Sequence, residues 1–399
     1  MNNPPRGRLF FANPGPTNIP DSILRAMHHA TVDFMSEDFL QLYDACTEGL
    51  KRVLRTGQHL FYYTGSGHAA WEACLVNLFS TGDKLLIVES GYFSDHWAKM
   101  ARGLGLATEL VAADWRRGVD LAAVRAALTA DTAHSIKGIC VVHNETATGA
   151  TLPLIEFRKA LDETNHPALF LVDTISSLGS IEFRMDDWGV DCAVGGSQKG
   201  LMLPAGLSFT GVSVKAMAAH RASTLPKHYF NWTLMLERRH KSFVGTVPVS
   251  FFYGLKEALR LFDEETLEGV WARHTRLAEA TRRAVRHWSG NNGPALFTLD
   301  PSRLSDSVTA VKLPEGHDAE AVRRTAYDRF RVSLGGGLGP LGGQVFRIGH
   351  LGDLNEPMIL GTLAAVEMSL AANNVPHSAG GINAAMRYLT ETAPLARAA

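Results

Sequence analysis

The sequence has few cysteines, and their spacing excludes the usual metal and disulfide frameworks. Cys46, Cys74, Cys140 and Cys192 lie far apart without any CxxC pattern, and no group of histidines and cysteines has metal-ligand spacing. We therefore expect no metal site. Isolated cysteines of this kind are typical of reduced, mostly buried thiols, so we expect a cytoplasmic protein.

Long hydrophobic runs and a charge of one sign are also missing. No apolar run reaches the roughly 18 residues that a membrane-spanning helix needs, and the first residues contain no apolar segment of signal-peptide length. Lys and Arg number 39 against 40 Asp and Glu, so no excess charge points to nucleic acid or to an anionic membrane. The 399 residues, 46% of them hydrophobic, suit a large globular domain plus a lesser one.

Short apolar runs alternate with amphipathic ones through the first half of the chain. The runs that predict buried strands are 59–64, 83–90, 136–144, 168–174 and 191–197. Strands alternating with helices predict an α/β fold, with a mostly parallel sheet between helices. Ligands of such folds bind at the carboxyl ends of the strands, so the loops after these runs are where a site is expected.

The pattern changes near residues 255–290, where one or two long helices are predicted. After them, SVTAVKLP and QVFRIGH read as strands of a smaller α+β unit. We expect three parts: an N-terminal arm (1–20), a large cofactor-binding domain (21–265) and a small C-terminal domain (266–399).

A strand, a Gly-Ser-Gly turn and a helix are predicted around GSGHAA (65–70). Glycines let backbone N–H groups approach an anion, and a helix N-terminus adds partial positive charge, so Ser66, Gly67 and His68 form a candidate phosphate cradle. The same string matches the dinucleotide fingerprint G-x-G-x-x-A, with Glu89 about 20 residues further on. An NAD-dependent dehydrogenase therefore stays as an alternative, whereas no Gly-Lys-Ser/Thr follows to make an ATP-type loop.

Lys199 lies in VGGSQKGLML (194–203), where only Ser197 and Gln198 are polar neighbours. Apolar surroundings favour the neutral, nucleophilic form of a lysine. Asp173 ends the run ALFLVDT, where a carboxylate is costly unless it is paired. Pyridoxal 5'-phosphate needs a phosphate cradle, a carboxylate for its ring nitrogen and a lysine for an imine. The chain offers all three, in this order, on successive strand ends.

Three further loops offer residues that suit such a site. Tyr92 or Phe93, directly after a strand, could stack on a flat ring. Thr146 or Thr148, in the polar loop after another strand, could bond the ring hydroxyl or the phosphate. Arg347, inside an apolar run, could hold a carboxylate with its guanidinium fork.

Six motifs in this order resemble one family over most of the chain. NPGPTNIP, GSGHAAWEA, HNETATG, LVDTISSLGS, GGSQKG and FRIGHLGD are similar to motifs of the class V aminotransferases of fold type I, in particular the serine–glyoxylate and alanine–glyoxylate group. The resemblance implies a mostly parallel seven-stranded sheet between helices, with a smaller C-terminal α+β domain. It also implies homodimers whose active sites lie at the interface.

The resemblance implies a role for each matching residue. Lys199 would be the Schiff-base lysine, Asp173 the partner of the pyridinium nitrogen and Arg347 the ligand of the substrate carboxylate. Thr246, in FVGTVPVS (243–250), would reach the phosphate of the partner's cofactor. The other implied contacts to pyridoxal 5'-phosphate are Ser66, Gly67, His68, Phe93, Thr146, Thr148 and Gln198.

The implied reaction is transamination from an amino acid to a 2-oxo acid such as glyoxylate or pyruvate. Phe243 replaces a phosphate-binding tyrosine of many relatives, and VDFMSEDF (32–39) lacks the His-Arg pair of many serine–glyoxylate enzymes. Pyridoxamine–pyruvate and aspartate–glyoxylate transamination are therefore alternatives, and a decarboxylase or lyase on this scaffold stays open. A dehydrogenase would leave Lys199 and Asp173 without a role. A cysteine desulfurase needs a late mobile cysteine, whereas the last one here is Cys192. A transcriptional regulator would need a DNA-binding module, for which we expect no room at either end.

Overall fold

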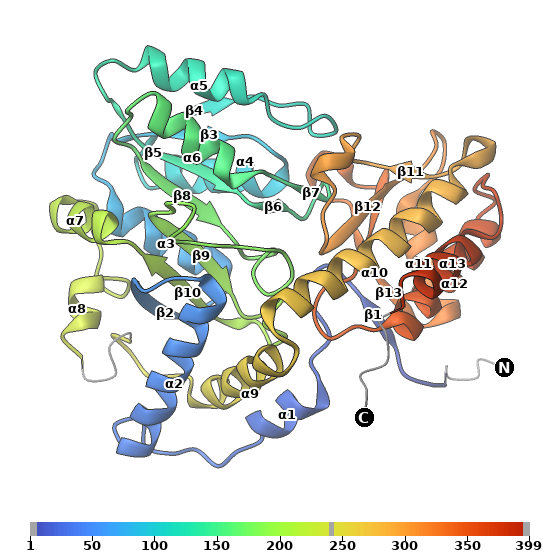
Figure 1. The fold of residues 1–399 in the computed structure, drawn as a ribbon, viewed down its shortest axis with the longest axis horizontal. Coiled ribbons are helices and arrows are strands. Elements are labelled where there is room, and N and C mark those ends of the chain that lie inside the picture. The colour runs from blue at the N-terminus through green and yellow to red at the C-terminus, as the bar shows by residue number, and fades with distance from the viewer. Residues whose placement is uncertain (1–5, 239–242, 394–399) are drawn as a thin grey trace.

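Two β-sheets, each covered by its own helices, organise the chain (Figure 1). The computed structural model describes residues 6–238 and 243–393. Residues 1–5 of the expected N-terminal arm and 394–399 of the expected small domain lie outside the described residues.

The larger sheet has seven strands in the order β2-β10-β9-β8-β5-β3-β4. Its strands are β2 (His59–Gly65), β3 (Lys84–Val88), β4 (Ala107–Val111), β5 (Ile136–Val142), β8 (Leu169–Asp173), β9 (Cys192–Gly196) and β10 (Gly206–Val212). β10 runs antiparallel to both of its neighbours, and the other pairs are parallel. The apolar runs of the sequence form five of these strands, and the predicted α/β class with a mostly parallel sheet is confirmed.

Alternating side chains on the strands build a separate core on each face of this sheet. In β2, Leu60 and Tyr62 belong to one core and Phe61 and Tyr63 to the other, because successive strand side chains point to opposite faces. The helices of the first core are α1 (Asp21–Met27), α2 (Glu37–Leu54), α5 (Leu121–Ala130), α6 (Leu154–Glu163) and α9 (Val249–Glu265). Those of the second are α3 (Gly67–Leu78), α4 (Tyr92–Gly103), α7 (Val214–Ala222) and α8 (Trp232–Leu236).

The loops after the parallel strands gather at one edge of the large sheet. β5, β8 and β9 run side by side in parallel, so their carboxyl ends meet there. Beyond β5 the chain forms a small antiparallel pair, β6 (Asn144–Glu145) and β7 (Ala150–Thr151). This pair holds the loop between its strands close to the ends of β5 and β8.

The second sheet has five strands in the order β1-β13-β14-β12-β11. Its strands are β1 (Phe10–Ala12), β11 (Ala295–Leu296), β12 (Val308–Lys312), β13 (Val332–Gly336) and β14 (Val345–Gly349). β1 pairs in parallel with β13, with Phe10 opposite Val332, so the start of the chain joins the sheet built by its last third. Packed on this sheet are α10 (Leu267–Trp288), α11 (Ala319–Phe330), α12 (Glu356–Ala372) and α13 (Gly381–Glu391).

One or two long helices were expected near residues 255–290, and the structure has two, α9 and α10, which meet at Thr266. Thr266 has a φ of 68°, an uncommon conformation for a β-branched residue, so the chain turns sharply between the two helices. Its hydroxyl accepts a hydrogen bond from the Gly269 N–H (3.2 Å) and thereby caps α10. The turn leads the chain from the elements of the large sheet to those of the second.

All four cysteines are buried and unpaired, as expected. No helix in the described part of the chain is both long enough and apolar enough to span a bilayer.

Candidate active site

A cavity of about 250 Å³ lies at the carboxyl ends of β5 and β8, beside the beginning of α3. Its lining residues come from segments far apart in the sequence, which the parallel strand order brings to one edge. They are Gly15, Pro16, Gly67, His68, Trp71, Phe93, Val142, Asn144, Thr146, Asp173, Ile175, Ser176, Gln198, Lys199 and Ala205.

Lys199 reaches this cavity from the loop that follows β9, and its side chain is buried. The Nζ atom donates a hydrogen bond to the Pro14 carbonyl (2.6 Å), and a Cβ on Gly15 would lie 2.3 Å from Nζ. Burial and, to a lesser degree, the nearby Arg347 charge lower the pKa of Lys199 to about 8, against the opposing charges of Asp173 and Glu145. The amine is therefore much closer to its neutral form at physiological pH than a surface lysine is.

Asp173 ends β8 with a fully buried carboxylate. Its Oδ2 accepts a hydrogen bond from Trp71 Nε1 (2.7 Å), and its Oδ1 accepts one from the Ile175 N–H (2.7 Å). Burial raises the pKa of Asp173 to about 6, while these two donors and the Lys199 charge lower it. The carboxylate is consequently ionised at neutral pH and faces a cavity that could hold a cation.

The Gly-Ser-Gly turn leads into α3, and its residues differ in their relation to the cavity. Gly67 and His68 line it, while Ser66 is exposed at the N-cap of α3 and its side chain makes no capping bond. A Cβ on Gly67 would lie 2.2 Å from Ile175 Cδ1, so a larger residue here would have to displace the end of the isoleucine side chain. Burial lowers the pKa of His68.

The dinucleotide interpretation of this turn is wrong. β2, which precedes the turn, lies at one edge of the sheet, whereas Glu89 follows β3, and β10, β9, β8 and β5 lie between the two strands. Glu89 instead accepts a hydrogen bond from Trp115 Nε1 (2.9 Å). A dinucleotide fold needs the acidic residue on the strand beside the glycine turn.

Phe93 lines the cavity from the first turn of α4. Its ring meets Trp71 edge to face, with centroids 6.3 Å apart. The alternative candidate, Tyr92, packs instead on His96, with centroids 3.9 Å apart. The sequence offered Tyr92 or Phe93 as the stacking aromatic, and of these two only Phe93 lines the cavity.

The loop between β6 and β7 carries both candidate threonines, and only Thr146 lines the cavity. Thr148 is fully buried, and its hydroxyl donates to the carbonyls of Glu145 (3.3 Å) and Ser90 (3.5 Å). This geometry therefore does not support the expectation that Thr148 contacts the cofactor, because the Thr148 hydroxyl bonds carbonyls of its own loop and of Ser90 instead.

Arg347 does not line the cavity but contacts Thr146, which does; it lies on the face of β14 that points away from the helices of the second sheet. Its neighbours Phe346 and Ile348 point into the helical core, so the pleat directs the guanidinium the other way. Nε donates to the Gly336 carbonyl (2.7 Å) and Nη1 to the Thr146 carbonyl (3.2 Å). Burial lowers the pKa of Arg347 to about 10, so it stays charged, with Nη2 free of any such bond to the described residues.

Gln198, Thr246 and Phe243 occupy different surroundings. Gln198 lines the cavity, and its Oε1 is buried without a hydrogen-bond partner among the described residues. Thr246 is exposed and does not line the cavity of its own chain. The Phe243 ring stacks on Tyr62, with centroids 6.4 Å apart, inside the first core.

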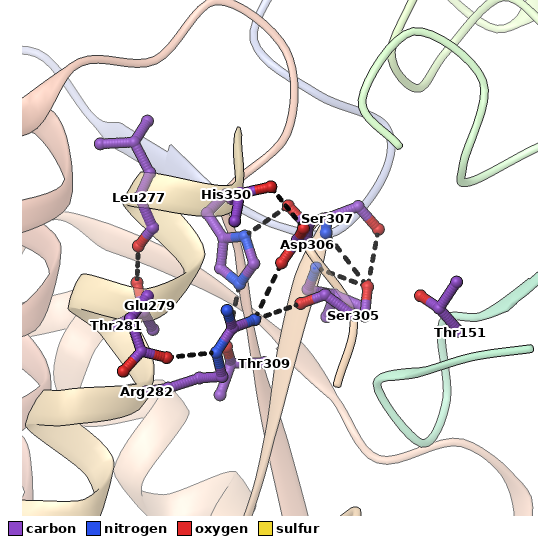
Figure 2. A network of polar contacts seen from close by, with 12 residues as sticks. Thr151, Leu277, Glu279, Thr281, Arg282, Ser305, Asp306, Ser307, Thr309 and His350 are labelled. Atoms are coloured by element: carbon purple, nitrogen blue, oxygen red, sulfur yellow. Dashed lines mark hydrogen bonds and ion pairs between the residues drawn. The ribbon is translucent and has the colours of Figure 1, made fainter. Parts of the chain in front are cut away.

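Elements of the second sheet hold the loop of Thr146 in place. Ser307 Oγ accepts a hydrogen bond from Asn144 Nδ2 (2.9 Å), and the Ser305 N–H donates to the Gly149 carbonyl (3.0 Å). Figure 2 shows how this serine segment is fixed: Arg282 of α10 bonds the Ser305 carbonyl and the Asp306 carboxylate, both at 3.0 Å. The buried arginine thus anchors the segment that holds the loop.

Sequence reasoning missed several residues of this site. Trp71 lies one helical turn after His68 and could have been found from that spacing. Glu145, next to Thr146, is fully buried, and an acidic residue directly after an apolar strand was the available signal. Pro14 and Gly15 left no signal of proximity to Lys199, because a contact over that sequence separation depends on the strand order.

The donor set fits pyridoxal 5'-phosphate. Asp173 offers a buried carboxylate to a protonated ring nitrogen, and Lys199 offers a partly neutral amine to an aldehyde. Gly67 begins a helix whose N–H groups suit a phosphate, and the amide of Gln198, whose Oε1 has no partner among the described residues, can offer its NH₂ donors to the same group. Phe93 supplies a ring-sized apolar wall between these ends.

Comparison with known proteins gives a consistent answer. The model of the family "Aminotransferase class-V" matches residues 9–328. The chain is 45% identical to the serine–glyoxylate aminotransferase of Methylorubrum extorquens over 99% of this chain and 98% of that one. It is 40% identical to the L-aspartate–glyoxylate aminotransferase of Paracoccus denitrificans, over 96% and 97%. The solved pyridoxamine–pyruvate aminotransferase of Mesorhizobium loti has a TM-score of 0.89 at 27% identity, covering 98% and 100%. The chain belongs to the class V aminotransferases, with their fold type I architecture.

Proposed function

We propose that this enzyme uses pyridoxal 5'-phosphate to transfer the amino group of a small amino acid, serine or alanine, to glyoxylate. The observation that carries the proposal is the burial of Lys199 and Asp173 around one cavity, with pKa values shifted to about 8 and about 6. Relatives at 40% and 45% identity are glyoxylate aminotransferases, which supports glyoxylate as the acceptor.

Five of the cavity residues would hold the cofactor. Asp173 would hold the ring nitrogen, Phe93 the ring face and Thr146 the ring hydroxyl, while the first turn of α3 at Gly67 and His68 would receive the phosphate. When bound, pyridoxal phosphate supplies an electron sink for the charge left on the substrate carbon. A carboxylate at the ring nitrogen keeps that nitrogen protonated and so strengthens the sink.

Lys199 would move the proton. With the cofactor bound, the free amine of Lys199 would take the proton from the substrate α-carbon and later return it. A pKa of about 8 suits a base that works near neutral pH. Arg347 would hold the substrate carboxylate with Nη2, because its other nitrogens already bond the Gly336 and Thr146 carbonyls.

The size of the cavity supports a small donor. Its volume of about 250 Å³ lies below the roughly 300–1,000 Å³ of most ligand pockets. Because the cavity must hold both the cofactor and the substrate, little room is left for the donor side chain. Serine and alanine add the least volume beyond the shared amino-acid atoms. Aspartate and pyridoxamine, the substrates named for two similar proteins, are the comparison donors.

We propose a homodimer in the cytoplasm. Thr246 is exposed and does not line its own cavity, which suits a contact with the phosphate bound by a partner subunit. Four buried, unpaired cysteines suit a reducing compartment.

Two experiments test the function. Lys199→Ala should abolish turnover, and borohydride reduction of the loaded wild-type enzyme followed by digestion should place the pyridoxyl group on the peptide that contains SQKG. Near-normal turnover of the variant, or no adduct on that peptide, would refute the cofactor assignment. A donor screen with glyoxylate as acceptor should rank serine or alanine above aspartate and pyridoxamine, and the reverse order would correct the substrate.

A further inference from the structure

Glu145 is a fully buried carboxylate for which the mechanism above has no use. No ion pair to it occurs in the described part of the chain; instead it accepts three backbone hydrogen bonds. Its Oε2 accepts from the N–H groups of Phe93 (3.0 Å) and Ser94 (3.3 Å), and its Oε1 accepts from that of Ala147 (3.1 Å). A carboxylate buried without a cation is costly, and these bonds offset part of that cost.

Two of the three bonds cap α4 from outside. The N-cap of this helix is Gly91, which has no side chain to accept the first N–H groups, and Glu145 takes that place from another loop. Gly91 has a φ of 157°, and a Cβ there would lie 2.5 Å from Glu145 Cγ. The glycine therefore makes room for the carboxylate, and the beginning of α4 is attached to the loop of Thr146.

The same side chain faces the charged groups of the site. Burial raises the pKa of Glu145 to about 7, the N–H donors of Ala147, Ser94 and Phe93 lower it, and the Asp173 charge raises it. In return, the negative charge of Glu145 raises the pKa values of Lys199 and Arg347. Glu145 thus supports the two cations on which the proposed function relies.

We propose that Glu145 is a positioning residue of the transamination site, which fixes Phe93 against the cofactor ring and the Thr146–Arg347 contact against the substrate carboxylate. The proposal rests on the proposed function. One carboxylate joins the wall that stacks on the cofactor to the loop that orients the arginine. A shift of Glu145 would therefore move both at once.

Glu145→Gln in the loaded enzyme is the test. The amide keeps one oxygen but turns its NH₂ group toward a backbone N–H, so α4 and the loop of Thr146 should separate slightly. We expect an altered visible circular dichroism band, because the ring wall moves, and a KM for the amino donor raised roughly tenfold, with a smaller change in kcat. The visible absorbance of the bound cofactor is also titrated with pH. Loss of the negative charge of Glu145 should lower the pH at which half of that absorbance change has occurred.

Glu367→Gln is the matched control. Glu367, in α12, also accepts three N–H bonds, from Trp288 Nε1 (2.8 Å), Gly380 (2.6 Å) and Ile382 (3.3 Å), but none of these donors belongs to α4 or to the loop of Thr146. This variant should lose thermal stability while its dichroism, titration midpoint and donor KM stay at the wild-type values. If Glu145→Gln behaves in the same way, the residue is structural only and the proposal is wrong.

Glu145→Asp covers the case in which the glutamine variant does not fold. It keeps the charge but is too short to reach α4, so the donor KM should rise while the titration midpoint stays near wild type. Hydrogen exchange of the cofactor-free protein should show faster exchange in residues 92–95 of this variant. Unchanged exchange and unchanged KM would overturn the proposal. The exchange readout is independent of the proposed function, which fails separately if wild-type enzyme forms no adduct at Lys199.

Discussion

At the scale of single residues, burial moves Lys199 and Asp173 toward neutrality from opposite directions. The pKa of the lysine falls to about 8 and that of the aspartate rises to about 6. Between these values both groups are mostly charged, and their mutual attraction offsets part of the cost of burial. The fraction of neutral lysine at pH 7 is then about one in ten, far above that of an exposed lysine.

The rate at which the cofactor-free enzyme captures pyridoxal phosphate should follow this titration. Capture needs the neutral amine, so the rate should rise about tenfold per pH unit below 8 and level off above it. Stopped-flow absorbance measures the rate, with Nα-acetyl-lysine as the control whose rate rises up to pH 10. An enzyme rate that keeps rising to pH 10 would show that Lys199 is not perturbed.

Trp71→Phe should weaken cofactor binding, and more so in acid. Its indole N–H lowers the pKa of Asp173, so the variant should protonate that carboxylate at higher pH and lose the partner of the ring nitrogen. We expect a dissociation constant raised about tenfold at pH 6 and less at pH 8. Trp97→Phe is the control, because Trp97 stacks on Trp71 at 5.6 Å and its Nε1 has no partner among the described residues. Equal effects of the two variants would assign the loss to packing.

Residues that follow strands could be found from the sequence, and residues that meet through space could not. Lys199 and Asp173 follow apolar runs, and the structure brings both to the cavity. Thr148 shares its loop with Thr146 but points inward, a difference that no spacing rule gives for an irregular turn. Trp71 could have been found from its helical spacing to His68, but a tryptophan in a helix is ordinarily part of the core.

At the scale of elements, the loop between β6 and β7 depends on a helix of the second sheet. Arg282 on α10 fixes the segment that holds Asn144 and Gly149 (Figure 2). The Arg282 side chain is 8% exposed and that of Asp306 is 24% exposed. The pair is therefore screened less than a surface ion pair, and its loss should be felt at the site.

Arg282→Ala should lower the free energy of unfolding by about 2–3 kcal/mol, somewhat less than a fully buried pair would cost. Hydrogen exchange in residues 143–151 should become faster at the same time, because their anchor is gone. Arg283→Ala is the control: both arginines pair with Glu279, at 3.0 Å from Arg282 and 3.1 Å from Arg283, but Arg283 lies over the exposed side of α10 against Tyr388. If both variants change the exchange of this loop equally, the anchor is not specific to Arg282.

The strands were predictable at this scale, but their order was not. Apolar runs bounded by polar residues locate β2, β3, β5, β8 and β9, because a buried parallel strand needs apolar residues on both faces. The order depends on which helices cross which face. The dinucleotide alternative fails on that order alone, since β2 and β3 lie on opposite sides of the sheet centre.

At the scale of the whole molecule, the proposed homodimer makes a prediction about mixed subunits. Lys199→Ala removes the amine from its own site, and Thr246→Ala removes a contact that we assign to the partner's site. Refolding the two variants together should create dimers with one intact site. At limiting cofactor the mixture should therefore show activity that neither variant shows alone, whereas simple averaging would place Thr246 outside the active site.

The pairing of β1 with β13 can form only late in the synthesis of the chain. Phe10 finds Val332 only after more than three hundred further residues have been added. At roughly 5–20 residues per second this takes on the order of 15 to 65 seconds. Lys199 is made 133 residues before Val332, so for about 7 to 27 seconds of that interval a nascent chain carries its reactive amine without the Pro14 carbonyl. The final third of the polypeptide, rather than the lysine loop itself, decides when the amine becomes sheltered.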